Sequence, residues 1–287
     1  MAGSRERARR RARERHETHR QIRQERYRRN RRRAGIGIAV LCVLGLVVGL
    51  SIAFIGGGTP KAAAKPKATA STSATASATA ATVSEPAHHC TYTSTSTGSK
   101  PSLPTSSPDY TATYTASINT NLGPIKIDLL NSKATCTVNS FVHLAETNFF
   151  NNTQCWRVDD SDGIYMLQCG DPTSGAKDKL SCSSSTLGSG GPGYEFDDEN
   201  LKGATYNAGT VAMANGGPNT NGSQFFLVFK NSSALGPDYT PFGTITSGLD
   251  ILQNVAKGGT SCNLSADIGG GVPKKKVIID SVTIKKT

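Results

Sequence analysis

The hydrophobic and polar positions after Tyr110 follow the short alternations that are typical of β-strands. The first stretch, TATYTASINTNLGPIKIDLL, alternates apolar and polar residues around an Asn-Leu-Gly turn, which predicts a β-hairpin. Further β-rich runs are CWRV, IYMLQC, TVAMA, SQFFLVF, FGTI and VIIDSVTI, and Gly, Pro, Asn and Asp separate them. These runs predict a mainly β domain built from many short strands.

Two segments in the same region have the spacing of a helix instead. Apolar residues recur at helical intervals between Val138 and Thr147, which predicts a first helix. A second helix is predicted over Leu249 to Ala256, just before the last strand. Because the helices are isolated and do not alternate with single strands, the pattern favours a closed barrel or a sandwich over repeated βα units.

A long apolar run lies near the start of the chain. Ala34 to Ile55 contains 22 residues without a charge, and about 20 apolar residues suffice to cross a bilayer. The alternative is a cleaved signal peptide, whose apolar core is typically about 7 to 15 residues long. The run is longer than that, and small-residue cleavage candidates such as Ala62 to Ala64 lie well past its end. The length therefore favours an uncleaved transmembrane helix.

The charge of the chain is concentrated before this run. Residues 1–33 contain 15 Arg and 4 Glu, so the formal net charge of +11 lies entirely in this arm. Basic residues that flank a span stay on the cytoplasmic side, so the arm is expected inside the cell membrane and the rest of the chain outside it. An Arg-rich arm can also bind nucleic acid. The span that separates the arm from the β domain disfavours a nucleic-acid partner.

The segment between the span and the β domain is poor in large apolar residues. From Gly56 to about Pro108 it consists mostly of Ala, Thr, Ser, Pro and Lys. Such a composition buries too little apolar surface to offset the entropy of the chain, which predicts a disordered linker. The expected domains are therefore an arm over 1–33, a transmembrane helix over 34–55, a linker over 56–108 and a folded domain over 109–287.

The common hydrolytic and metal-binding motifs are absent from the sequence. It contains no HExxH, no GxSxG, no Walker loop and no CxxC. His88 and His89 have no second ligand group at metal spacing, so they are interpreted as solvated side chains. Asp159, Asp160 and Asp162 are interpreted as a solvated acidic turn instead of a calcium site. No metal and no cofactor are expected.

Four segments occur in an order that points to one family. They are WRVDDSDGIYMLQCGDP, GPGYEFDDEN, VAMANGGPNTNGSQFF and PFGTI, and together they resemble the cyclophilin family. The family's string Met-Ala-Asn-x-Gly-Pro-Asn-Thr-Asn-Gly-Ser-Gln-Phe-Phe is matched almost letter for letter from Met213 to Phe226. Its strand with a catalytic Arg, followed by Phe-Met-x-Gln-Gly-Gly-Asp, is matched by Arg157, Tyr165, Met166, Gln168, Gly170 and Asp171. The resemblance covers about Tyr110 to Ile284.

The resemblance implies a fold, an activity and a set of site residues. The implied fold is a closed eight-stranded antiparallel barrel capped by two α-helices, and the implied activity is cis/trans isomerisation of peptidyl-prolyl bonds without a cofactor. The implied catalytic residues are Arg157, Gln168 and Phe226. The implied substrate-binding residues are Tyr165, Met166, Ala214, Asn215, Gln224, Leu235 and Tyr239. The expected role is to help exported, proline-containing proteins fold, as a monomeric domain outside the membrane.

The residue types agree with this chemistry. Rotation about an X-Pro bond faces a barrier of about 18 to 20 kcal/mol because the amide has partial double-bond character. An apolar slot for the proline ring and a few fixed donors are enough to favour the twisted amide, and no nucleophile is needed. The alternative is a non-catalytic proline-peptide-binding or chaperone-like module on the same fold. The presence of Arg157, Met166, Gln168 and Phe226 favours the enzyme.

Seven cysteines divide between the span and the domain outside it. Cys42 lies in the apolar run, which leaves an even number in a compartment where disulfides persist. In the hairpin that the resemblance implies, Cys155 and Cys169 face each other beside Arg157. The remaining cysteines are then paired as Cys90 with Cys136 and Cys182 with Cys262. Two departures from the family pattern border the site: Trp156 replaces an aromatic residue or His, and the loop DDSDG is longer than the family's Pro-Gly turn.

Overall fold

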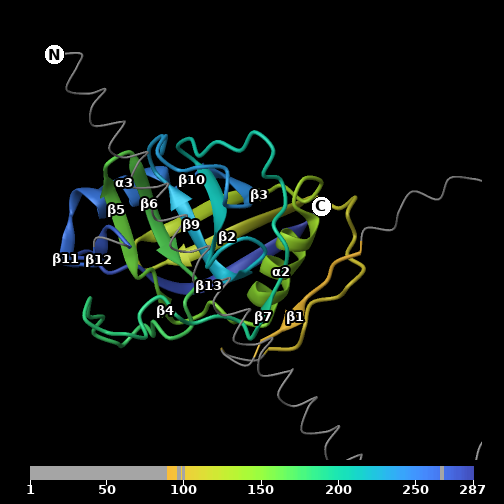
Figure 1. Cartoon of the computed structure of the whole chain (residues 1–287), viewed down its shortest axis with the longest axis horizontal. Helices are drawn as coiled ribbons and strands as arrows, with labels where there is room; N and C mark the ends of the chain where they lie inside the picture. Colours follow the sequence, from red (N-terminus) through yellow and green to blue (C-terminus); the bar gives the residue numbers. More distant parts are fainter. Residues whose placement is uncertain (1–88, 96–97, 99–100, 266–267) are drawn as a thin grey trace, which may run out of the picture. The chain divides into compact units, whose positions relative to one another are not determined.

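The computed structural model describes residues 89–95, 98, 101–265 and 268–287 (Figure 1). The predicted arm over 1–33, the predicted span over Ala34 to Ile55 and the first part of the predicted linker lie outside the described residues. Among the helices that the structure describes, none has both the length and the apolar character that a membrane crossing requires.

The described residues form a mainly β domain with two helices, as expected. The helices are α2 (Thr135–Glu146) and α3 (Leu249–Lys257). The strands are β1 (Thr93–Ser94), β2 (Tyr114–Thr120), β3 (Gly123–Leu129), β4 (Thr153–Gln154), β5 (Arg157–Ser161), β6 (Ile164–Cys169), β7 (Tyr194–Glu195), β8 (Thr210–Asn215), β9 (Asn221–Val228), β10 (Pro241–Ser247), β11 (Thr260–Asn263), β12 (Gly271–Pro273) and β13 (Ile278–Lys286).

Helix α2 begins three residues before the predicted start at Val138, and a distant side chain explains the difference. The N–H groups of Cys136 and Thr137 donate to the carboxylate of Glu199, at 3.1 and 2.8 Å. A carboxylate stabilises the positive end of a helix and satisfies N–H groups that have no partner within the helix. The extra turn is therefore capped by a residue from another part of the sequence.

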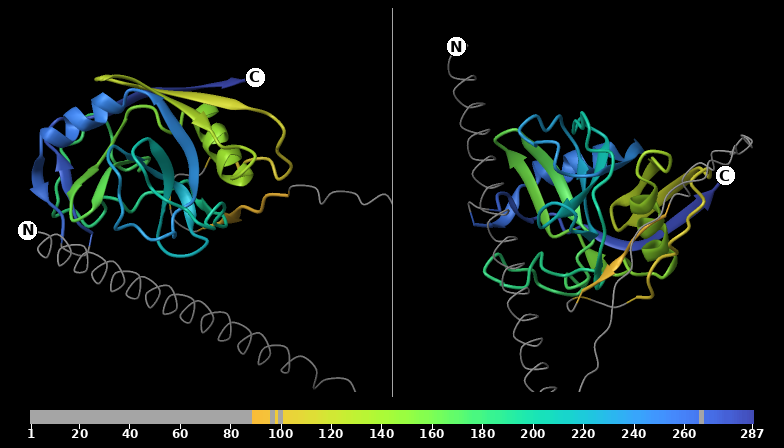
Figure 2. Two further views of the ribbon diagram at one scale, coloured as in Figure 1. Left: turned by 90° about the horizontal axis from the view of Figure 1, so that it is seen from above. Right: turned by 45° about the vertical axis from the view of Figure 1, so that its right-hand side comes forward.

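One antiparallel sheet contains most of the strands. Its order is β11-β12-β5-β6-β9-β8-β10-β3-β2-β13-β4, so the eight strands from β5 to β13 form its central part. The sheet is strongly curved, and α2 and α3 lie toward opposite ends of it (Figures 1 and 2).

The expected closed barrel is not found, because no ladder joins β5 to β13 among the described residues. Instead, β4 pairs with β13 and the chain then continues into β5. The N–H of Cys155, which lies between β4 and β5, donates to the carbonyl of Val277 at 3.0 Å. A connecting segment thus spans the gap that a strand ladder would have closed.

Strands β6, β8 and β9 are apolar on both faces. Leu167, Val211 and Phe225 point into the main core, where Phe141 of α2 packs edge-on against Phe225 at 5.5 Å between ring centroids. The alternate residues of the same strands face the other way and form a second apolar cluster. Strands that are buried on both sides read as nearly continuous apolar runs, which accounts for sequences such as IYML and QFFLVF.

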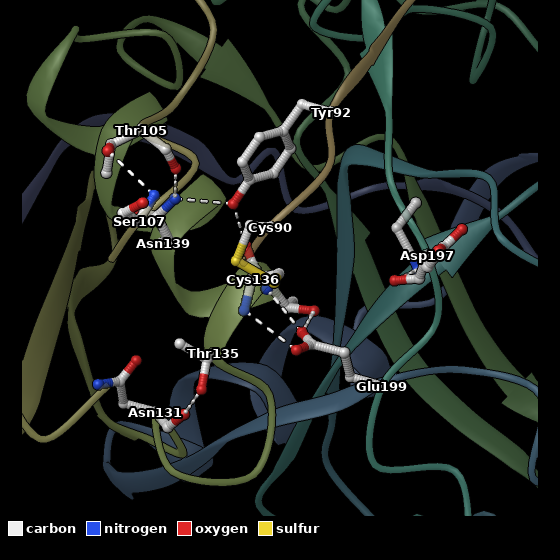
Figure 3. The surroundings of a disulfide bond; sticks show 12 residues. Cys90, Tyr92, Thr105, Ser107, Asn131, Thr135, Cys136, Asn139, Asp197 and Glu199 are labelled. Carbon is white, nitrogen blue, oxygen red and sulfur yellow. Dashed lines mark hydrogen bonds between the residues drawn. A yellow bond between two sulfur atoms is a disulfide. The ribbon is translucent and has the colours of Figure 1, made fainter. Parts of the chain in front are cut away.

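The composition of residues 56–108 predicts a linker, but residues 89–95 and 101–108 are part of the domain. Strand β1 pairs with β7, and a disulfide joins Cys90 to Cys136 of α2 (Figure 3). The ring of Tyr92 packs edge-on against Tyr194 and Phe196, at centroid distances of 5.5 and 5.6 Å. One disulfide and one aromatic ring supply contacts that the average composition of the segment conceals.

The structure contains the three disulfides whose partners were expected. Cys90 pairs with Cys136, Cys155 with Cys169, and Cys182 with Cys262. The second joins the connection between β4 and β5 to the end of β6 and is buried in the main core. The third joins the long loop between β6 and β7 to β11.

Candidate active site

The three residues implied to be catalytic lie in one row across the sheet. Arg157 of β5 is opposite Gln168 of β6, which is opposite Phe226 of β9. Phe226 in turn is opposite Ala212 of β8. Neighbouring strands lie about 4.8 Å apart and directly opposite residues share a face, so these side chains are neighbours on the outer face of the sheet.

The guanidinium group of Arg157 is held from three sides. Its Nε donates to the carbonyl of Gly269 at 3.0 Å, and its Nη1 donates to Oε1 of Gln168 at 3.1 Å. Its Nη2 donates to Oδ2 of Asp159 at 3.2 Å. The side chain retains 14% of its exposure to solvent. A planar, permanently charged donor is therefore fixed in one orientation while part of it remains accessible.

Gln224 connects Gln168 to the glycine-rich loop that precedes β7. Its Oε1 accepts from Trp156 Nε1 and from Gln168 Nε2, both at 3.0 Å. Its Nε2 donates to the carbonyls of Gly188 and Gly190, at 2.9 and 2.8 Å. A side-chain amide has two donor hydrogens and two acceptor lone pairs, and all four are used here. Gln224 was expected to bind substrate, but its amide is committed to contacts within the protein.

Trp156 lies directly under this loop. A Cβ placed on Gly188 would overlap the indole ring, and Gly188 has φ of +78°. Glycine tolerates both the contact and the left-handed backbone, which no other residue does without strain. Trp156, which departs from the family pattern, thus supports the loop that lies beside the row of catalytic candidates.

The second apolar cluster lies next to Gln168 and Phe226. Its buried members are Met166, Tyr206, Ala212, Phe226, Val228 and Tyr239. Half-buried Ala214 and Leu235 pack against it. Edge-on packing of Phe226 against Tyr239, at 5.5 Å between centroids, orders the rings. Met166, Ala214, Leu235 and Tyr239, which were expected near the substrate, are therefore brought together.

A buried tyrosine fixes the segment that carries Tyr239. The hydroxyl of Tyr206 donates to the carbonyl of Tyr239 at 2.8 Å and accepts from its N–H at 3.0 Å. Burial raises the pKa of Tyr206, so its hydroxyl stays protonated and able to donate at any physiological pH.

Tyr165 does not join this cluster. It packs against the main core, with its ring 6.3 Å from that of Phe229, and Nζ of Lys230 lies 4.2 Å from the centre of the ring. Successive residues of a strand point to opposite faces, so Tyr165 and Met166 diverge. The structure thus does not support Tyr165 as part of the apolar slot.

A cavity of about 250 Å³ adjoins the row on the side of Gln168 and Gln224. Asn215 contributes to its wall, and its Nδ2 donates to the carbonyl of Asp238 at 2.8 Å. Thr95, from the segment tied down by the Cys90–Cys136 disulfide, also contributes to the wall. Loss of hydration raises the pKa of Glu195, another residue of the lining.

Asp159 was not predicted to be a site residue, although it contacts Arg157. Asp159 was interpreted as part of a solvated turn, but it lies inside β5 and is 2% exposed. Its position two residues after Arg157 in a strand places it on the same face as the guanidinium. The prediction of a turn over DDSDG concealed this signal, because β5 continues to Ser161 and the reversal occurs at Asp162 and Gly163.

The profile described as cyclophilin type peptidyl-prolyl cis-trans isomerase/CLD matches residues 115–284, which is more than half of the chain. This chain belongs to the cyclophilin family. The cyclophilin match includes both helices and the strands β5, β6, β8 and β9 that carry the site, and it begins after the N-terminal segment that the Cys90–Cys136 disulfide attaches. The resemblance noted in the sequence is confirmed.

Curated cyclophilin relatives are similar over the same region. The chain is 43% identical over 182 residues to the probable peptidyl-prolyl cis-trans isomerase B of Mycobacterium leprae, a match that covers 59% of this chain and 56% of the relative. It is 41% identical over 184 residues to the protein of the same description from Mycobacterium tuberculosis, covering 58% and 53%. The chain therefore spans about half the length of these relatives.

The chain is also similar to solved cyclophilin structures. Two crystal structures of a Cryptosporidium parvum cyclophilin type peptidyl-prolyl cis-trans isomerase match with TM-scores of 0.48 and 0.49 and sequence identities of 27% and 26%. The matches cover 60% and 61% of this chain and 99% of each solved chain, and the first structure was determined in the presence of the dipeptide Ala-Pro.

Proposed function

We propose that this cyclophilin domain catalyses the cis/trans isomerisation of X-Pro peptide bonds. The observation that carries the proposal is the row of Arg157, Gln168 and Phe226, in which a fixed cation lies beside an apolar surface. Family membership and the names of the mycobacterial relatives support the same activity.

The proposed mechanism requires no proton transfer. The proline ring packs on the apolar cluster around Phe226 and Met166, which keeps water away from the X-Pro peptide bond that rotates. The guanidinium of Arg157 donates toward the prolyl nitrogen and so weakens the amide resonance that creates the barrier. Gln168 accepts from Nη1 of Arg157 at 3.1 Å and so helps to fix the orientation of the guanidinium donors. Catalysis follows because these donors favour the twisted amide over either planar form.

The test is a measurement of exchange between the cis and trans forms of short X-Pro peptides by NMR, with the full chain in detergent micelles. Uncatalysed exchange takes tens to hundreds of seconds, so acceleration is easily detected. The emission of Trp156, the single Trp of the chain, reports binding independently because the indole contacts Gln224 at the cavity wall. Acceleration together with a saturable change in emission supports the enzyme. A saturable change without acceleration would instead indicate a peptide-binding module.

We further propose that the domain assists the folding of exported proteins on the outer side of the cell membrane, as a single-pass protein anchored by Ala34 to Ile55. The apolar run, the Arg-rich arm before it and the cysteine pairs after it support this location. In intact cells from which the wall has been removed, added protease is expected to digest the domain and to spare the arm. Protection of the domain would contradict the proposed topology.

A further inference from the structure

We propose that Asp159 is a positioning residue, which holds the guanidinium of Arg157 in its working orientation. The inference rests on the proposed function, since it concerns how the same site is kept ready for a proline peptide. It assigns a role to a carboxylate that the motifs of the sequence leave unexplained.

The contacts of Asp159 account for both of its oxygens. Oδ2 accepts from Nη2 of Arg157 at 3.2 Å, and Oδ1 accepts from the hydroxyl of Ser161 at 2.8 Å. Arg157, Asp159 and Ser161 alternate along β5 and share one face of the strand. Ser161 therefore orients the carboxylate, and the carboxylate orients the guanidinium.

The surroundings of Asp159 are nearly closed to water. Its side chain is 3% exposed, and Met166 of the apolar cluster lies opposite it on β6. A Cβ on Gly269 would lie 2.9 Å from Oδ2, so the backbone at Gly269 packs directly over the carboxylate. The carbonyl of Gly269 also accepts from Nε of Arg157. A charge in such a place is costly unless it is paired, and its pairing with Arg157 offsets this cost.

The position itself argues for a role in the site. A buried strand residue that lies opposite Met166 is apolar by default. An ion pair there contributes less to stability than an apolar side chain of similar volume, so stability alone gives little reason for the carboxylate. The ion pair does, however, fix the orientation of the guanidinium of Arg157. With Gln168, Gly269 and Asp159 around it, the flat guanidinium is bound at Nη1, Nε and Nη2.

The decisive comparison is between Asp159→Asn and Asp160→Asn in the full chain. The two variants remove the same charge from adjacent residues, but Asp160 is exposed and lies outside the contacts described for the guanidinium. For a short X-Pro peptide, Asp159→Asn is expected to lower kcat about tenfold with KM within about twofold, because orientation matters most in the transition state. Asp160→Asn is expected to match the wild type. Equal or higher kcat in Asp159→Asn would overturn the proposal.

A second measurement separates this proposal from the proposed function. The Nε–Hε signal of Arg157 in 15N spectra of the full chain is assigned by its disappearance in Arg157→Ala. It is expected to shift and broaden in Asp159→Asn and to stay unchanged in Asp160→Asn. If the wild type fails to accelerate isomerisation, the proposed function is wrong, while an unchanged signal in Asp159→Asn would refute the positioning role by itself.

A third variant tests the positioning role even if Asp159→Asn does not fold. Ser161→Ala keeps both charges and removes only the hydrogen bond that orients the carboxylate. It is expected to lower kcat about two- to threefold with an unchanged melting temperature, a smaller effect in the same direction because the ion pair remains. If Asp159→Asn does not fold, an unchanged kcat in Ser161→Ala would contradict the proposal.

Discussion

Replacement of Arg157 by Ala is expected to lower kcat/KM for X-Pro peptides by about 10²- to 10³-fold, the usual cost of removing a preorganised donor from the transition state. Arg157 is the single Arg after residue 33, and no neighbouring side chain of the row carries a positive charge that could replace it. The variant retains the apolar cluster around Phe226, so peptides are still expected to bind. The measurement is NMR exchange for the rate and Trp156 emission for binding.

The matched control for this variant is Lys230→Ala. Lys230 is an exposed cation on the same domain, and it lies over Tyr165 on the side of the sheet away from the row. Its removal changes the net charge by the same amount and is expected to leave the rate unchanged. If both variants lost activity equally, the effect would come from the overall field of the protein and the specific role of Arg157 would be refuted.

Arg157→Ala is also expected to change stability, because it removes the cation that pairs with the buried carboxylate of Asp159. Arg157→Ala leaves the carboxylate of Asp159 without its cation in a nearly dry place, which is expected to lower the free energy of unfolding. The double variant Arg157→Ala with Asp159→Asn removes this unpaired buried charge. It is expected to recover stability without recovering activity, which separates the loss of a catalytic donor from a loss of folding.

The parts of the site that were predicted from the sequence are those carried by strand motifs. Gln168 and Phe226 lie in two separate motifs, and the structure places them opposite each other on β6 and β9. Tyr165 lies in the same motif as Gln168, yet it packs on the other face, because a motif states which residues are adjacent in sequence and alternation decides which share a face. Site residues taken from a strand motif therefore need to be checked against the period of two.

The two main corrections have a common physical cause. The acidic run after Val158 and the polar segment before Pro108 both have compositions that favour solvent exposure, and in both a few specific contacts decide otherwise. Asp159 is drawn into the fold by an ion pair, and Tyr92 by two aromatic rings. The composition of a segment does not record such pairwise contacts, whether the partner is two residues away, as for Asp159, or in a distant strand, as for Tyr92. The prediction of a closed barrel was wrong for a related reason. The barrel closes only if β5 and β13 pair with each other, and local sequence patterns do not show whether they do.

The N-terminal segment leads to a second large effect, this time on stability. The double variant Cys90→Ser with Cys136→Ser is expected to lower the free energy of unfolding by about 4 kcal/mol, from the chain entropy released when a cross-link over 46 residues is removed. The disulfide joins residues that lie before the family match to helix α2 within it (Figure 3). The measurement is urea unfolding of the oxidised proteins, with the slope compared to verify a single transition.

Tyr92→Phe provides the matched control for the same segment. It keeps the ring against Tyr194 and Phe196 but removes the hydroxyl, which donates to the carbonyl of Cys136 at 2.8 Å and accepts from Asn139 at 2.7 Å. The expected loss is about 1 kcal/mol, typical of a hydrogen bond exchanged for solvent. If neither variant changed the unfolding free energy, residues 89–95 and 101–108 would contribute nothing to the stability of the fold. A large loss in the disulfide variant with a small loss in Tyr92→Phe would establish instead that the covalent link is the main attachment of this segment, which includes Thr95 of the cavity wall.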